Sequence, residues 1–95
     1  MNDSLSSVLA ALSDPTRRAV VEQLIHGQAS VSELHEPHQM ALPTFMRHLK
    51  VLESCGLVRS IKRGRIRTCQ LSMAPLLEVQ GWLAWQTTLR EDRGD

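Results

Sequence analysis

Apolar residues in the first part of the chain recur at intervals of three and four positions, the spacing of helices with one buried face. The first run, residues 5–12, predicts a short amphipathic helix. Asp14 followed by Pro15 is an N-cap acid before a first-turn proline, and it predicts the start of a second helix that ends at Gly27. The apolar side of this second helix carries Val20, Val21, Leu24 and Ile25.

Two more helices follow in the pattern. Ser30 and Glu33 form a capping box that opens a third, very short helix through Leu34, and Pro37 interrupts it. A fourth helix is predicted for about residues 42–54, and Gly56 after it is the residue that ends it.

The fourth helix has two chemically different faces. At roughly 100° per residue its large apolar side chains share one face, namely Leu42, Phe45, Met46, Leu49 and Leu52. The opposite face is basic and polar and carries Thr44, Arg47, His48, Lys50, Val51 and Ser54. A helix that packs on a domain and enters a groove needs this arrangement, although an ordinary amphipathic surface helix has it too.

From residue 57 the period changes to the alternation of strands, with β-branched residues at positions 61, 66 and 68. We predict two antiparallel strands, about residues 57–62 and 66–71, joined by a tight turn at Arg63-Gly64. A cationic hairpin is often only a soluble edge. Directly after a basic helix, it is more typical of a wing that touches phosphates.

A last helix opens at Ser72 or Ala74-Pro75, and a polar tail that frays is expected from about residue 90. Its apolar residues cover an arc of about 180°, wider than the roughly 100° that one core requires. They are Leu76, Val79, Trp82, Leu83, Trp85 and Leu89. We therefore predict a homodimer in which the first helix lies beside the last, with an interface of Leu5, Leu9, Trp82, Trp85 and Leu89. The alternative is that both tryptophans belong to the monomer's own core.

Charge divides the chain into two parts. Seven of its eleven Lys and Arg residues lie in residues 47–67 beside a single acid, a formal +6, whereas the remaining residues carry a formal −5. Such a cationic surface on a helix and hairpin can follow a polyanion. The chain has one Phe, no Tyr and two Trp near its C-terminus, so a base-stacking platform for single strands is not expected.

The 95 residues predict one domain, residues 1–95, with a modest core. We find no apolar run long enough to cross a membrane, no secretory signal, and only two cysteines, so we expect a cytoplasmic, reducing setting. The sequence shows no nucleophile–base set, no paired carboxylates and no glycine-rich phosphate loop, so we expect that the protein is not an enzyme.

Three separated motifs then resemble one family. Residues 11–18 read Ala-Leu-Ser-Asp-Pro-Thr-Arg-Arg, residues 40–53 read Met-Ala-Leu-Pro-Thr-Phe-Met-Arg-His-Leu-Lys-Val-Leu-Glu, and Gly-Leu-Val at 56–58 precedes an Arg-Gly-Arg wing. The chain resembles the ArsR-type bacterial transcriptional repressors, in the branch without metal sites, over about residues 5–72. The resemblance implies a mainly helical winged helix-turn-helix fold, in the order of four helices, two hairpin strands and a last helix. It also implies a dimeric, often autoregulating repressor of a palindromic double-stranded DNA operator.

By this resemblance the fourth helix enters the major groove. The positions that the family uses at DNA are occupied by Thr44, Arg47 and His48. The positions that match phosphate contacts are Lys50 and, on the wing, Arg59, Lys62, Arg63, Arg65 and Arg67. Two positions depart from the family, with Ala41 where a capping Ser is usual and Met46 where Ser or Thr is common.

No metal and no cofactor are expected. Where metal-sensing relatives carry Cys-x-Cys, this chain has Ser30 and Ser32, which offer no thiolates to soft ions. His35 and His38 flank Pro37 without a completing ligand set.

Several alternatives stay open. Cys55 is most easily a small buried hydrophobe and Cys69 could face either way, so a redox-responsive or small-molecule-responsive form of the same repressor stays open, with the effector unidentified. A winged-helix module that binds protein is the second alternative. His48 could be an incidental surface histidine, and Arg17 and Arg18 either fix the second helix or reach phosphate.

Overall fold

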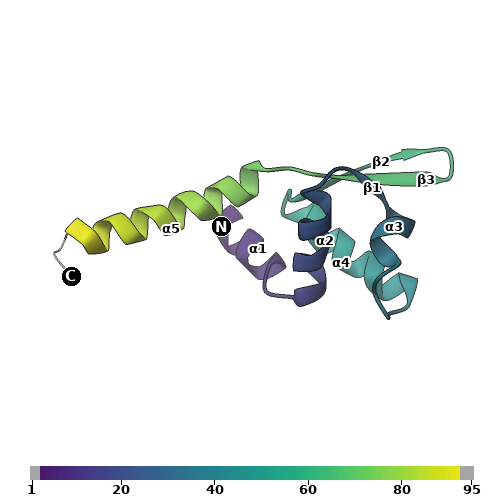
Figure 1. Ribbon diagram of the computed structural model, residues 1–95, viewed down its shortest axis with the longest axis horizontal. Helices are drawn as coiled ribbons and strands as arrows, with labels where there is room; N and C mark the ends of the chain where they lie inside the picture. The colour runs from purple at the N-terminus through teal and green to yellow at the C-terminus, as the bar shows by residue number, and fades with distance from the viewer. Residues whose placement is uncertain (1–2, 93–95) are drawn as a thin grey trace.

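The computed structural model describes residues 3–92, which form five helices and three strands (Figure 1). Their bounds are α1 (Ser4–Ala11), α2 (Pro15–Leu24), β1 (Ala29–Ser30), α3 (Val31–His35), α4 (Leu42–Ser54), β2 (Val58–Arg63), β3 (Ile66–Leu71) and α5 (Ala74–Asp92). The predicted fold class, mainly helical with a β-hairpin wing, is confirmed. β1 is the one element that the sequence pattern did not predict.

Side chains cap α2 and α3 as the sequence predicts. Asp14 accepts a hydrogen bond from the backbone N–H of Arg17 at 3.0 Å and so starts α2. Ser30 and Glu33 form both halves of the capping box of α3, at 3.1 and 2.8 Å. Ala41 gives α4 no side-chain cap, but this helix still begins at Leu42. Pro43, in the first turn, suits the start of a helix and accompanies this uncapped beginning of α4.

The sheet has the order β1-β3-β2, and all its pairs are antiparallel. β2 and β3 pair from Val58 opposite Leu71 to Arg63 opposite Ile66, around a turn in which Gly64 has φ 62°. β1 adds only two pairs, opposite residues 68 and 69. The end of the wing is consequently a two-stranded ribbon that extends beyond the third strand.

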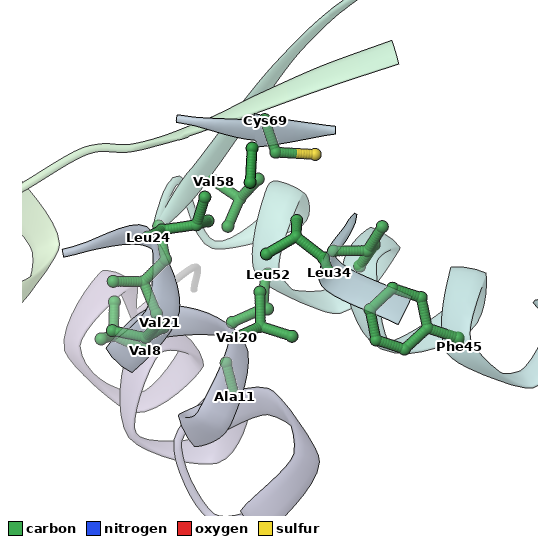
Figure 2. Packing of buried hydrophobic residues seen from close by; sticks show 13 residues of the cluster. Val8, Ala11, Val20, Val21, Leu24, Leu34, Phe45, Leu52, Val58 and Cys69 are labelled. Carbon is green, nitrogen blue, oxygen red and sulfur yellow. The ribbon is translucent and has the colours of Figure 1, made fainter. Parts of the chain in front are cut away.

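Four helices and the sheet share one core of thirteen buried residues (Figure 2). α4 contributes Phe45, Leu49 and Leu52, each at most 1% exposed, and the sheet contributes Val58 and Cys69. The other members are Val8, Ala11, Val20, Val21, Leu24, Ala29, Leu34 and Leu57. The burial of its inner face thus holds α4 in place.

α5 is built differently, because none of the residues Ala74–Asp92 is buried. The helix leaves the body past α1 and gives the chain an extent of 55 × 30 × 25 Å (Figure 1). Trp82 is 45% exposed and Trp85 59% exposed, so the alternative that they lie in the monomer's core is wrong. The helix continues through Asp92 rather than fraying at Arg90, and the rest of the predicted tail lies outside the described residues.

Three predicted inner positions are also corrected. Leu42 is 48% exposed, because it occupies the first position of α4, before the packed turn begins at Phe45. Ile25 is 55% exposed at the C-cap of α2, where the helix has already ended. Cys55 is half-buried rather than buried, at the C-cap of α4. A helical wheel places residues around an axis but does not say where the neighbouring elements stop.

Candidate nucleic-acid interface

The outer face of α4 presents Thr44, Arg47 and Lys50 to solvent. These side chains lie opposite Phe45, Leu49 and Leu52, whose burial fixes the rotation of the helix. Arg47 and Lys50 also line a shallow hollow of about 410 Å³ between α4 and α1. The structure therefore places three predicted DNA contacts on one exposed helix face.

His48 does not share that face in the predicted way. Its Nδ1 lies 3.1 Å from Nη1 of Arg17 and 3.7 Å from Oδ2 of Asp14, and its side chain is 20% exposed. The buried stripe of α4 is rotated toward His48 compared with the helical wheel, so the imidazole packs against the start of α2. This contact makes His48 a link between α4 and α2, and its predicted role at DNA stays a prediction.

Arg17 resolves an alternative that the sequence left open. Its Nε donates to the carbonyl oxygen of Ala11 at 2.7 Å, and its Nη2 donates to the carbonyl oxygen of Ala10 at 3.1 Å, at the C-terminal end of α1. Arg18 likewise donates to the Leu12 carbonyl at 2.7 Å. Both arginines thus join α2 to the end of α1 through backbone oxygens.

The same junction shifts the titration of Asp14. Burial acts to raise the pKa of this carboxyl, but the N–H of Arg17 and the electrostatic attraction of the neighbouring His48 and Arg17 outweigh it, and the pKa is lowered. The ionised carboxylate is therefore the form that caps α2.

The wing divides its cations between two faces. Side chains alternate along a strand, and Cys69, which is buried, defines the face toward the helices. Through the register, Lys62 and Arg67 belong to that inner face, whereas Arg59 and Arg63 belong to the outer one. The predicted single cationic surface is thus two surfaces that meet at the tip, where Arg65 follows the turn.

A groove of about 750 Å³ runs between β3, near the tip of the wing, and the segment that begins α3. Lys62, Arg65 and Arg67 line one side, and the other side holds backbone and side chains of residues 28–33 with Met46 of α4. Cations and hydroxyls around such a groove suit the phosphates of a nucleic-acid backbone. Three polar residues that line the groove, Gln28, Ser32 and Thr68, were not among the predicted contact residues, because no sequence pattern connects them with the wing.

The histidines near α3 have packing partners. The rings of His35 and His38 lie 5.1 and 5.4 Å from the ring of Phe45, centroid to centroid, and Nε2 of His35 is 2.7 Å from the Met40 carbonyl oxygen. Within residues 3–92, no three His, Cys, Asp or Glu side chains gather as a metal site would require. None of the described helices is long and apolar enough to span a membrane.

Cys69 points into the core and is a free thiol. Burial raises its pKa, and the nearby Glu53 carboxylate raises it further, against the opposing effect of Arg67. The protonated thiol, a weak nucleophile, is therefore the favoured form of Cys69.

Comparison with known proteins places this geometry in a family. Residues 12–61 match the family model described as "Helix-turn-helix domain". The chain is similar to the HTH-type transcriptional regulator Rv2034 of Mycobacterium tuberculosis, with 44% identity over 70 residues, 74% of this chain and 65% of the relative. It thus spans slightly less than two thirds of that relative.

Two solved structures extend the likeness to nearly the whole chain. The crystal structure of ArsR family transcriptional regulator RHA00566 matches with 48% identity and a TM-score of 0.92, over 94% of this chain and 98% of that one. The homodimeric winged helix-turn-helix domain of Mb0332 from Mycobacterium bovis shares the fold, with 22% identity and a TM-score of 0.68 over 96% and 82% of the two chains.

Proposed function

The chain belongs to the ArsR family of helix-turn-helix transcriptional regulators, and from this premise we propose that it is a homodimeric repressor of a palindromic DNA operator. In this proposal residues 1–95 act as one DNA-binding domain in the cytoplasm, without catalysis and without a metal or cofactor. Autoregulation of its own operon is part of the same proposal.

One observation carries the proposal. The exposed face of α4 and the groove beneath the wing bring Arg47, Lys50, Lys62 and Arg65 to the surface beside one buried core. The segment that contains them has a formal charge of +6, although the whole chain has a formal charge of only +1. A module that binds only protein has no need for this concentration of charge, which favours DNA over that alternative.

The two parts of the surface have different tasks. Arg47 on α4 presents a planar fork of donors that can pair with a guanine edge in the major groove. The exposed wing cations contact phosphates, which fix register and carry no base information. These cations are Arg59, Lys62, Arg63 and Arg65. Thr44 and Lys50 flank Arg47 on the same helix face.

The proposed dimer joins two such surfaces. α5 carries exposed Trp82, Trp85 and Leu89, and α1 beside it carries exposed Leu9 and half-buried Leu5. A second chain that covers these residues would create a two-fold protein, whose two copies of α4 can lie one helical turn of DNA apart. The relative Mb0332 is homodimeric, which supports this assembly.

Selection of bound duplexes from a random-sequence pool tests the function. We expect enrichment of an inverted repeat whose half-sites are about 10 base pairs apart, centre to centre. The variant Arg47→Ala serves as the control, and it should fail to enrich that repeat while it still retains duplex. A pool that stays random after several rounds with the unmodified chain would contradict sequence-specific recognition.

A further inference from the structure

A single acid interrupts the basic segment, and it lies where α4 meets the wing. Glu53, in the last turn of α4, is the only acid among residues 47–67. Its Oε2 accepts a hydrogen bond from Oγ of Ser60 on β2 at 3.1 Å. The same Oγ accepts a hydrogen bond from Nη1 of Arg67 on β3, also at 3.1 Å. Two hydrogen bonds in series thus join the helix to both strands of the wing.

The chemistry of this bridge is complementary at each step. A serine hydroxyl offers one donor and two acceptor positions, and Ser60 uses both kinds. Both bonds involve one charged group, which makes them stronger than neutral ones. All three side chains are half-buried, which reduces the competition from water. The charges of Glu53 and Arg67 also both act on the thiol of Cys69, the residue paired with Ser60.

The position of the bridge matters for the wing. Val58 and Cys69 are the buried residues of the hairpin strands, and β1 pairs with β3 only at residues 68 and 69. Beyond them, residues 61–67 form a two-stranded ribbon, a structure that is marginally stable alone. The bridge lies between this buried base and the cationic tip.

We infer that Glu53 is a positioning residue that, through Ser60 and Arg67, fixes the direction of the wing relative to α4. The helix and the wing then meet DNA as one preorganised surface, so less conformational freedom is lost on binding. One guanidinium nitrogen of Arg67, Nη1, is engaged by Ser60, and the predicted phosphate contact of this residue stays a prediction. The hydrogen bonds of the bridge do not depend on the proposed function, whereas their effect on DNA affinity rests on it.

Simple charge and the bridge predict opposite signs for one substitution. Glu53→Ala removes an acid from a basic surface, so electrostatics alone would tighten binding to DNA. Loss of the bridge weakens binding instead. We expect Glu53→Ala to bind random-sequence duplex about three- to tenfold more weakly, the size of one net hydrogen bond. The salt slope should stay within about half a unit, because no phosphate contact is lost.

Matched variants separate position from charge. Glu53→Gln keeps an acceptor oxygen and should lose less affinity than Glu53→Ala. Glu22→Ala removes an exposed acid from α2, outside the basic segment, and should not weaken binding. Ser60→Thr keeps the hydroxyl and should bind better than Ser60→Ala, which removes it. Neither Ser60 substitution changes the charge. If circular dichroism shows that Glu53→Ala does not fold, the comparison of Ser60→Thr with Ser60→Ala tests the bridge in its place.

A second measurement needs no DNA. Amide hydrogen exchange of residues 61–67 should accelerate in Glu53→Ala, while exchange in α2 should stay unchanged. If the unmodified chain binds no duplex, the proposed function is wrong. Hydrogen exchange alone then tests whether the bridge holds the wing. The inference is overturned if Glu53→Ala binds as tightly as the unmodified chain or more tightly, or if exchange in its wing is unaltered.

Discussion

The body of the molecule, residues 4–71, and helix α5 treat their apolar residues in opposite ways. The body buries thirteen residues from four helices and the sheet, and six of its core side chains other than alanine and cysteine are 0% exposed. α5 is longer than any other helix of the described chain, yet it buries none of its residues Ala74–Asp92. Both regions carry leucines, valines and aromatic residues, so composition does not explain the difference. The burial differs because the elements of the body have neighbouring elements to pack against, whereas most of α5 has none.

This contrast teaches what the chain needs from a partner. A long helix that packs only near its start gains little from tertiary contacts, and most helical stability in proteins comes from such contacts. Leu76 and Val79 pack partly on the core, whereas Trp82, Leu83 and Trp85, further along, are exposed. The body is packed as a complete domain is packed. The exposed apolar residues of α5 instead fit a surface that a second chain would cover.

The largest expected effects break the two regions separately. Leu52→Ala opens a cavity in the body and should cost about 2–5 kcal/mol of unfolding free energy, measured by chemical denaturation. Trp82→Ala with Trp85→Ala should instead leave the body folded by circular dichroism and shift the dimer to monomer, since buried interface tryptophans often contribute about 2 kcal/mol or more. Unfolding of the tryptophan variant without dissociation would erase the proposed distinction.

The next prediction sharpens the comparison within the body, between α4 and the wing. Arg47→Ala should weaken operator binding by about 1–3 kcal/mol and affect random duplex far less. Arg65→Ala should weaken both about equally and lower the salt slope by about one unit. Titrations of both variants at several salt concentrations measure these effects. Equal losses on the two DNAs for Arg47→Ala would remove it from the base-reading residues.

A smaller effect concerns the cap that holds α2 beside α4. Asp14→Ala should cost about 1 kcal/mol of unfolding free energy at neutral pH, because the N–H of Arg17 loses its acceptor. The folded-state pKa of Asp14 is lowered, so its contribution is complete above the ordinary carboxyl pKa and disappears as pH falls through the lower folded value. Denaturation at pH 7 and at progressively lower pH should therefore show a difference between Asp14→Ala and the unmodified chain that is complete at pH 7 and shrinks as the Asp14 carboxyl is protonated. A difference that persists in acid would assign the effect to packing.

The smallest expected effect is none. Ser30 and Ser32 provide hydroxyls and no thiolates, and the rings of His35 and His38 pack on Phe45. Treatment with a chelator should change neither the thermal transition nor operator affinity. A change of about tenfold or more on adding zinc, cadmium or arsenite would point first to the two histidines.

Local signals made much of this fold predictable from sequence. The capping box at Ser30 and Glu33, the Asp14-Pro15 start and the inner residues of α4 depend on neighbours only a few positions away. Features that depend on distant neighbours were missed. β1 has two residues and hence no period, and Ile25 is exposed because its helix ends there.

The same distinction applies to the candidate site. The cations of α4 and the wing could be listed from the sequence, because charge and alternation are local properties. Their division between two faces of the wing, and the contacts of His48 with Arg17 and of Arg67 with Ser60, join residues from different elements. The spacing of these residues in the sequence does not predict those contacts.

Sedimentation equilibrium of the unmodified chain, at micromolar concentration and with circular dichroism on the same sample, tests most directly whether a second chain completes α5. We predict a folded species of twice the chain mass of 10.7 kDa, which binds one operator duplex as a dimer. A folded species of 10.7 kDa that binds the operator as a single chain would contradict the dimeric repressor.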